Sequence, residues 1–307
     1  MLKKAFIFLF LLFCSMMIRP VFAGETIPLI PTNLVLPPCD GFMPPSPMEW
    51  NKEIEQMTSA LLTNPQSADN YVRRGIAYGE LGQHEQAIAE YNQALKIDSK
   101  NADAYFNRGF DYEEKGNSQQ ALADYDKAIE LNPKMAEAYT GRGRILNERG
   151  ENKKAIEEYT KAIKIDPNYQ EAYYDRALAY DDLHDYTNAG ENYRKAIALN
   201  PNDACAYNNL ALDEQAQGNY VGALSNFNRA ITTDPQLASA FGNRGALYAI
   251  QGKSDQALSD FNQAIRLEPT DSEWYRRRSN LYWKRGEYQK SFGDFWSLIK
   301  FRLIKNA

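Results

Sequence analysis

The sequence predicts an all-α fold, a solenoid of stacked helix pairs, and three features of the 307 residues support this prediction. Prolines recur every 34 positions from Pro133 to Pro269, and Pro65 stands two periods before the first of them. Small and aromatic residues fall at fixed places within each period. A glycine in the middle of most periods and the proline near the end are typical helix-terminating signals. A fixed period of this length is the pattern of a repeat protein.

Seven repeats follow from this count, and each is predicted to hold two helices, at positions 1 to about 14 and about 18 to 31. Position 8 is always small, position 20 is alanine in six repeats, and position 24 is always tyrosine or phenylalanine. Helices this short are marginal alone in water, so these positions must be buried between neighbouring units. The repeats span residues 68–101, 102–135, 136–169, 170–203, 204–237, 238–271 and 272–305.

The residues at these positions resemble the tetratricopeptide repeat (TPR). An aromatic residue at position 4, a small residue at 8, alanine at 20, an aromatic residue at 24 and proline at 32 match that family over residues 68 to 305. The resemblance implies a right-handed superhelix whose concave face, lined by the first helices, binds proteins or peptides. This chain departs from the pattern at Glu214, where tyrosine is usual, and in repeat 7 at Ser279, Ser291 and Leu298.

The part before the repeats divides into three predicted segments. Residues 1–23 have a basic start, an apolar run from Ala5 to Cys14 and small residues near Ala23, which is the layout of a cleaved secretory signal. A membrane anchor is the alternative, but the run is shorter than the roughly 20 residues that a spanning helix needs. Residues 24–48 are predicted to form a Pro-rich linker, and 49–66 an N-terminal capping helix before the repeat region, 67–307. We expect a periplasmic or secreted protein of a bacterial host.

Charge and cysteine content narrow the possible partners. Without residues 1–23 the chain has 32 basic and 40 acidic residues, a formal charge of −8. This balance disfavours a nucleic-acid partner, because phosphate binding needs a basic face. Cys39 and Cys205 remain, and their spacing leaves open whether they form one disulfide or stay two unpaired thiols.

The sequence contains no constellation of residues that indicates catalysis. His84 and His184 lie at predicted turns with no cysteine or metal-binding motif nearby, and no nucleophile or nucleotide-binding motif occurs. The polarity of turns explains both histidines. We predict a non-catalytic protein with no metal and no cofactor.

The resemblance implies contacts to a ligand from positions 2, 5, 6, 9, 12 and 13 of the repeats. In repeats 1 to 4, positions 2, 12 and 13 are rich in acidic residues, and positions 5 and 9 supply a few aromatic anchors, which favours a protein or basic peptide as the partner. The alternative is a solvated face of mixed charge. The predicted groove residues are Asp69, Asp103, Phe106, Asn107, Phe110, Glu113, Glu114, Glu137, Glu148, Glu171, Tyr174 and Asp182.

The last predicted helix is more apolar than the earlier second helices and is punctuated by basic residues. Most repeat arrays end in a polar-faced cap. This helix is therefore predicted either to contact a membrane surface or to pair with another copy or partner, and the alternative is a terminal helix folded over its neighbour. Its predicted docking residues are Phe292, Trp296, Ile299 and Phe301.

Position 7 is arginine in six repeats, although arginine is an unusual core residue. Position 23, on the second helix, is acidic in five of those six repeats, and the repeat that has Leu210 instead of arginine has the neutral Asn226. This covariation predicts ion pairs that join the two helices of a repeat, with Gly109 of repeat 2 lying opposite Ala121. The predicted pairs are Arg74 with Glu90, Arg108 with Asp124, Arg142 with Glu158, Arg244 with Asp260, and Arg278 with Asp294.

Three functions are compatible with these observations. The first is an exported interaction scaffold with a peptide-binding groove. The second is an assembly or secretion accessory that docks on a membrane or a complex through its last helix. The third is an enzyme with an unfamiliar site, which would need a cluster of titratable residues in a closed pocket. We favour the first, because the resemblance implies binding.

Overall fold

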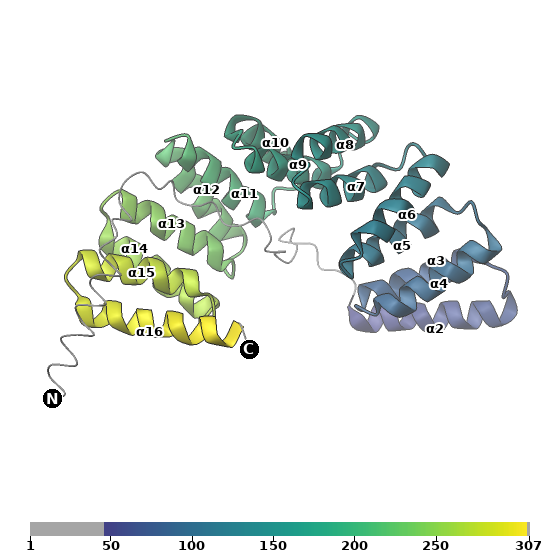
Figure 1. Cartoon of the computed structure of the whole chain (residues 1–307), viewed down its shortest axis with the longest axis horizontal. Coiled ribbons are helices and arrows are strands. Elements are labelled where there is room, and N and C mark those ends of the chain that lie inside the picture. Colours follow the sequence, from purple (N-terminus) through teal and green to yellow (C-terminus); the bar gives the residue numbers. More distant parts are fainter. Residues whose placement is uncertain (1–45, 306–307) are drawn as a thin grey trace. The chain divides into compact units, whose positions relative to one another are not determined.

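The computed structural model describes residues 46–305 of the chain. The expected signal segment and all but the last three residues of the expected linker lie outside the described residues. Over residues 46–305 the chain forms α-helices, α2 to α16, and no strand. The predicted all-α class is therefore confirmed (Figure 1).

Each repeat contributes two helices, at positions 1–13 and 17–30, in the first six repeats. The first helices are α3 Ala68–Glu80, α5 Ala102–Glu114, α7 Ala136–Glu148, α9 Gln170–Asp182, α11 Ala204–Ala216, α13 Ala238–Ile250 and α15 Ser272–Lys284. The second helices are α4 His84–Ile97, α6 Ser118–Leu131, α8 Asn152–Ile165, α10 Tyr186–Leu199, α12 Tyr220–Thr233, α14 Ser254–Leu267 and α16 Tyr288–Lys305.

The helix that precedes the repeats, α2 (Pro47–Thr63), begins two residues before the expected capping segment. Ser46 caps it in a capping box with Glu49, and Pro47 occupies the first turn, where the missing N–H costs nothing. α2 packs on α3, and Thr58 Oγ1 accepts a hydrogen bond of 3.0 Å from Arg74. Thr58 lies one period before Asn92, so α2 takes the place of a second helix in front of repeat 1.

Every helix packs on the next one along the chain, and most first helices also contact the first helix of the next repeat. In a stack, the side on which successive units come closest is the inner side. We call the surface lined by the first helices the inner face. None of the helices in residues 46–305 is long and apolar enough to cross a membrane.

The core repeats with the same period as the sequence. The aromatic side chains at position 24, from Tyr91 to Phe261, and the alanines at position 20, from Ala87 to Ala257, are almost fully buried. Small residues at position 8 make room for the rings, since a Cβ atom on Gly75 would lie 2.5 Å from Tyr91. A Cβ atom on Gly109 would lie 3.0–3.2 Å from atoms of Tyr125 and Asp124, so the two helices of repeat 2 approach closely there, and the expected position opposite Ala121 stays a prediction.

The turn between the two helices of a repeat requires a left-handed backbone. Six repeats place glycine there, with φ between 71° and 79°, whereas repeat 4 has His184 at φ 58°. A side chain in this conformation costs about 1–3 kcal/mol. The ring of His184 recovers part of this cost, because its Nδ1 lies 3.2 Å from the Tyr186 hydroxyl.

We expect His184→Gly to raise the free energy of unfolding by about 1 kcal/mol, since relief of the strained backbone outweighs the greater flexibility of unfolded glycine. Thermal unfolding followed by circular dichroism should show a midpoint about 2–4 °C higher. The reverse change at an equivalent turn, Gly150→His, should lower the midpoint. A lower midpoint for His184→Gly would mean that the Tyr186 contact dominates.

Candidate peptide-binding groove

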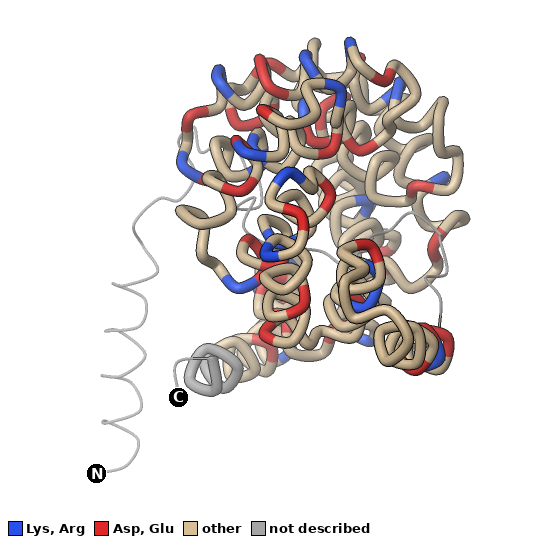
Figure 2. The backbone as a smooth tube through the Cα atoms, turned by 90° about the vertical axis from the view of Figure 1, so that its right-hand side faces the viewer, with Lys and Arg blue, Asp and Glu red and all other residues tan. Residues whose placement is uncertain are grey.

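The inner face presents a regular row of carboxylates in repeats 1 to 4. Position 2 of each repeat opens the first helix, and the residues there, Asp69, Asp103, Glu137 and Glu171, are all exposed. Glu114 and Glu148 at position 13 are exposed as well. Acidic side chains in the first turn also stabilise the helix through its dipole, so a structural role accounts for part of this pattern. Figure 2 shows that acidic and basic residues are interspersed along the array.

Three of the predicted groove residues meet at one pocket. Asp103 and Phe106 of α5 and Glu137 of α7 line a hollow of about 350 Å³. Asn132, Lys134 and Met135, from the turn between α6 and α7, complete its wall. The pocket therefore combines an aromatic ring and a thioether with two carboxylates and one ammonium group. Lys134 and Met135 were not among the predicted residues, because they belong to the turn between repeats rather than to a first helix.

Glu113 is not available to a ligand in the way the sequence predicted. Its carboxylate accepts hydrogen bonds from Arg144, with Nε at 2.7 Å and Nη2 at 3.1 Å, and one from the Tyr125 hydroxyl. The side chain is 11% exposed. Glu113 therefore links α5 to α7 and neutralises Arg144, so the inner face is less acidic than predicted.

Arg144 and Asp175 are residues on this face that the prediction missed. They stand at positions 9 and 6, which are implied groove positions, so the same position count identifies them. The Arg144 guanidinium lies 6.0 Å from the centre of the Phe110 ring and 3.9 Å from Asp175. Burial raises the pKa of the Asp175 carboxyl to about 7, although Arg144 acts in the opposite direction. Arg144 thus holds two carboxyl groups and one aromatic ring at the centre of the inner face.

Several other predicted groove residues form hydrogen bonds or ring contacts with other residues of the protein. Asp182 accepts a hydrogen bond of 2.9 Å from Asn147, and the Asn107 side chain donates to the Asp103 carbonyl at 2.8 Å. The Phe106 ring packs 5.9 Å from that of Tyr125. The Tyr174 hydroxyl accepts from Asn209 at 3.1 Å. Phe110 is 40% exposed, whereas Phe106 and Tyr174 are half-buried.

The predicted arginine pairs lie together in the structure. Arg108 donates to both oxygens of Asp124 at 2.7 Å, and bonds of 2.6–2.9 Å join Arg244 to Asp260 and Arg278 to Asp294. Arg74 reaches Glu90 at 2.7 Å and 2.9 Å. In repeat 4, which lacks the acid, Arg176 donates to Asn192 at 2.9 Å.

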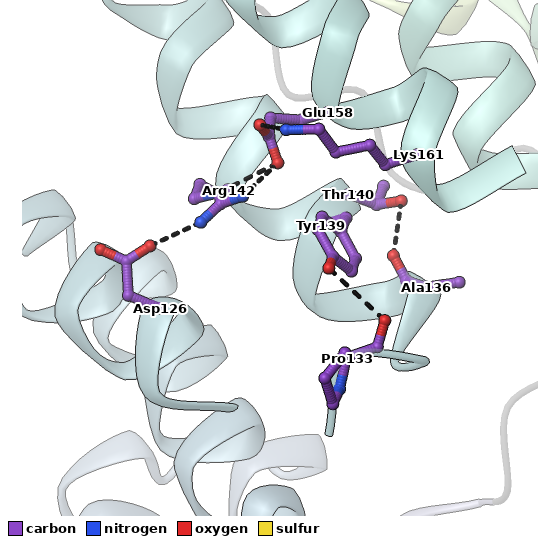
Figure 3. A network of polar contacts seen from close by, with 8 residues as sticks. All are labelled: Asp126, Pro133, Ala136, Tyr139, Thr140, Arg142, Glu158 and Lys161. Atoms are coloured by element: carbon purple, nitrogen blue, oxygen red, sulfur yellow. Dashed lines mark hydrogen bonds and ion pairs between the residues drawn. The ribbon is translucent and has the colours of Figure 1, made fainter. Parts of the chain in front are cut away.

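Each arginine also makes two contacts that the sequence analysis missed. Figure 3 shows Arg142 between Glu158 of its own repeat and Asp126 of the preceding repeat, at 2.5 Å and 2.7 Å. The guanidinium lies 5.5 Å from the centre of the Tyr139 ring, and the same stacking on position 4 recurs in every repeat that has the arginine. The arginine therefore connects the two helices of its own repeat and also connects that repeat to the preceding second helix.

Repeat 5 has Leu210 in place of the arginine, so another residue links it to the preceding repeat. Glu214 accepts from Asn226 at 2.8 Å and from Arg194 of the preceding repeat at 3.1 Å. The unusual Glu214 therefore replaces the missing arginine as the residue between repeats 4 and 5. A pocket of about 530 Å³ opens nearby and is lined by Tyr207, Ser225, Asn226, Asn228, Arg229 and Thr232.

The C-terminal docking residues are described only in part. Phe292 is half-buried against Trp283, at 6.4 Å between ring centres, and Trp296 is 68% exposed. The side chains of Ile299 and Phe301 lie outside the described part. Trp283 and Tyr288 are 44% and 52% exposed. The described end of the array thus presents a group of aromatic side chains to solvent.

Family models and solved structures both match the chain. The family model described as "TPR repeat" matches residues 75–116 and 143–184. Two models described as "Tetratricopeptide repeat" match residues 102–135 and 171–203, and residues 202–269. The comparison with curated proteins gives no match.

Several solved structures share the fold. The APC/C hetero-tetramer Cut9–Hcn1 matches with a TM-score of 0.68 and 15% identity, over 76% of this chain and 46% of that chain. The chain thus spans less than half of that relative. PilF of Pseudomonas aeruginosa matches with a TM-score of 0.61 and 23% identity, over 67% and 94% of the two chains. PilW, described as a type IV pilus biogenesis factor, gives 0.62 and 20%, over 67% and 96%.

At these identities the likeness to solved structures shows the fold alone, whereas the family models match the repeats themselves. Their matches overlap and together run from residue 75 to residue 269 with one short gap. Proteins of this fold are typically non-catalytic interaction scaffolds. The chain belongs to the tetratricopeptide repeat family.

Proposed function

We propose that the protein is an exported, non-catalytic scaffold that binds a basic, partly apolar segment of a partner protein on the inner face of repeats 1 to 4. The observation that carries this proposal is the pocket between α5 and α7. Asp103 and Glu137 flank it, and Phe106 and Met135 supply apolar wall. A lysine or arginine side chain has the matching form, because its stem is apolar and its head is cationic.

Charge supports the same class of partner. No ion pair joins Asp103, Glu137 or Glu171 to a cation within residues 46–305. These carboxylates can therefore attract a basic segment at long range and speed its association. Export is supported by the layout of residues 1–23, and the net negative charge without them disfavours nucleic acid.

Binding of a labelled peptide series tests the proposal. The probes are fluorescent nine-residue peptides that carry a central lysine or arginine beside leucine or phenylalanine, with norleucine versions as neutral controls. We expect the basic peptides to bind more tightly, and Asp103→Lys with Glu137→Lys to weaken them at least tenfold, about 1.4 kcal/mol. Glu113 is left unchanged in this design, because its pairing with Arg144 would make its loss a folding defect.

A matched control separates the groove from net charge. Glu157 is exposed on the second helix α8, outside the inner face. Glu191 is likewise exposed, on the second helix α10. Glu157→Lys together with Glu191→Lys changes the net charge by the same amount and should leave the affinity nearly unchanged. Equal loss in both double variants, or affinity that does not fall with added salt, would contradict the proposal.

A second function is supported by the end of the array. Trp296 on α16 is 68% exposed. Trp283 and Tyr288, whose ring centres lie 4.8 Å apart, are 44% and 52% exposed on the same pair of helices. Docking on a membrane or on a multiprotein complex through this end would cover these rings. Co-sedimentation with anionic vesicles and analytical ultracentrifugation of wild type and Trp296→Ser test it. Unchanged vesicle binding and unchanged association state would remove this function.

A further inference from the structure

The guanidinium of Arg229 lies over an aromatic ring that a different arginine covers in other repeats. Arg229 stands at position 26 of repeat 5, on α12, and its guanidinium is 5.8 Å from the centre of the Tyr207 ring. In the six repeats with arginine at position 7, that arginine lies over the ring at position 4. Repeat 5 has Leu210 at position 7, so Arg229 takes this place over Tyr207.

Arg229 lacks the carboxylate that accompanies most of the position-7 arginines. Five of those arginines form an ion pair with the acid at position 23 of their own repeat. Position 23 of repeat 5 is Asn226, whose amide donates to Glu214 at 2.8 Å. Glu214 also pairs with Arg194 at 3.1 Å, so its charge is already neutralised. Repeat 5 therefore has the ring and the guanidinium without the carboxylate.

The acid that pairs with a cation at position 26 elsewhere is missing as well. In repeat 2, Lys127 binds Glu130, three residues later, at 2.9 Å. The same place in repeat 5 is Thr232, and α12 contains no acidic residue. In the part of the chain that the structure describes, no ion pair joins Arg229 to an acid. Arg229 is thus an exposed cation whose charge the described chain leaves without a partner.

Arg229 lines the hollow of about 530 Å³ together with Tyr207 of α11 and further residues of α12. On its wall, Thr232 Oγ1 donates to the Asn228 carbonyl at 2.8 Å, and Asn228 Oδ1 accepts from Arg244 at 2.6 Å. Ser225 and Arg229 are exposed on the same wall, and among the described residues neither side chain has a hydrogen-bond partner. The hollow therefore offers O–H and N–H donors beside one positive charge, which are the groups that bind an oxyanion.

We propose that this hollow binds a carboxylate, presented by an acidic side chain of a partner protein. A planar guanidinium binds both oxygens of a carboxylate with two parallel hydrogen bonds, and stacking over Tyr207 restricts its orientation. The Ser225 hydroxyl donates a further bond. The ligand completes in repeat 5 the set of ring, guanidinium and carboxylate that five other repeats build from their own residues. A hollow of this size also has room for the chain next to the acidic side chain.

This site is independent of the function proposed above. It belongs to repeat 5, whereas the groove for a basic segment belongs to repeats 1 to 4, and it selects the opposite charge. Arg229→Gln should accordingly leave the binding of the basic peptides unchanged. The failure of one proposal can thus be told from the failure of the other.

Fluorescence anisotropy with the full chain tests the site. The probes are labelled nine-residue peptides with blocked ends, which carry glutamate or, as the neutral control, glutamine among alanine and serine. We expect the glutamate peptide to bind at least tenfold more tightly than the glutamine peptide, and Arg229→Gln to abolish this preference. Arg266→Gln removes the same charge from an exposed arginine on α14 and should keep it.

A second pair of variants tests the site with Arg229 still in place. Thr232→Glu puts a carboxylate three residues after Arg229, which is the spacing of Lys127 and Glu130 in repeat 2. It should pair with Arg229 and weaken the glutamate peptide at least tenfold. Thr232→Gln has nearly the same size without the charge and should bind within about threefold of wild type.

Three results would overturn the proposal. The first is equal affinity of wild type for the glutamate and glutamine peptides. The second is an equal loss in Arg229→Gln and Arg266→Gln, which would trace the preference to net charge. The third is tight binding of the glutamine peptide once its C-terminus is left free, with no gain from glutamate, because the ligand would then be a chain end and not an acidic side chain.

Discussion

Replacing Arg108 with leucine is expected to lower the free energy of unfolding by about 3–5 kcal/mol, because it leaves a buried carboxylate without its cation. Asp124 has a side chain that is 8% exposed, and Arg108 donates to both of its oxygens. The hydrogen bond to Asp124 raises the pKa of the Arg108 guanidinium, so the arginine keeps its charge. Arg108 also bonds Asn92 of the preceding repeat at 2.6 Å. Urea unfolding followed by circular dichroism measures the loss.

The chain offers its own control for this change. Repeat 5 has Leu210 and Asn226 at the two positions that Arg108 and Asp124 occupy in repeat 2. The double variant Arg108→Leu with Asp124→Asn therefore reproduces these two residues of repeat 5, but not Glu214, which binds Asn226 there and is replaced by Tyr112 in repeat 2. We expect it to be clearly more stable than Arg108→Leu alone, because no buried charge is left over. The two single variants and the double variant form a cycle that measures the coupling.

An additive result would contradict this account of the pair. If the double variant loses as much stability as the sum of the two single variants, Arg108 and Asp124 contribute independently. In that case the Asn92 and Tyr105 contacts of Arg108 would account for its presence. The same cycle on Arg244 and Asp260 should give a similar coupling, since their bonds are equally short.

Replacing Asp213 with asparagine is expected to stabilise the protein at pH 7 by about 2–4 kcal/mol. Asp213 on α11 is 2% exposed and forms a carboxyl pair with Asp181 on α9. One oxygen of each carboxyl, Asp181 Oδ1 and Asp213 Oδ2, is buried without a partner. The other oxygen of Asp181 accepts from the Tyr193 hydroxyl at 2.7 Å. Burial, and next the negative charge of Asp181, raise the pKa of Asp213 to about 10.

The sign of the pH dependence follows from this raised pKa. At pH 7 the folded pair holds a proton that the unfolded carboxyl groups release, so the folded state binds more protons. Stability from this pair is therefore greatest below the ordinary aspartate pKa of about 4 and falls as the pH rises toward the raised pKa. Asparagine keeps a hydrogen-bond donor beside Asp181 at every pH, so the variant should lose the slope above about pH 6. Burial still raises the pKa of Asp181 to about 6, so a slope below that pH should remain. Urea unfolding at pH values from 4.5 to 8 measures it.

A charge-matched control completes this test. Glu137→Gln removes one negative charge from the exposed surface of α7 and should change neither the stability nor its pH slope by more than about 0.5 kcal/mol. A destabilised Asp213→Asn variant, or one with the wild-type slope, would show that the two carboxyl groups do not share a proton in the folded state.

Much of this fold can be read from local patterns, because each repeat makes the same short-range contacts. The spacing of the prolines and of the glycines predicted the helix pairs, and the helices begin and end close to those positions. The covariation of position 7 with position 23 indicated which side chains meet, since both lie within one repeat of 34 residues. The exception in repeat 5 was visible as well, because Leu210 and Asn226 changed together.

The candidate site was harder to predict, because its properties depend on contacts between repeats. Glu113 was counted as a free negative charge, yet Arg144, 31 residues later, neutralises it. The sequence of α9 or α11 gives no sign that Asp181 and Asp213 form a pair. The pKa of a carboxyl group rises when packing removes its water and places a second carboxyl group beside it. The turn residues Lys134 and Met135, between α6 and α7, likewise line the pocket together with residues of α5.

The sequence by itself determined the helical repeats, their register and the arginine pairs, because these rest on periodic burial and on neighbours within one repeat. Only the tertiary structure decided which charges on the inner face remain free, which are neutralised and which share a proton. These outcomes depend on desolvation and on distances between first helices of successive repeats, and neither quantity is encoded in a single period of the sequence.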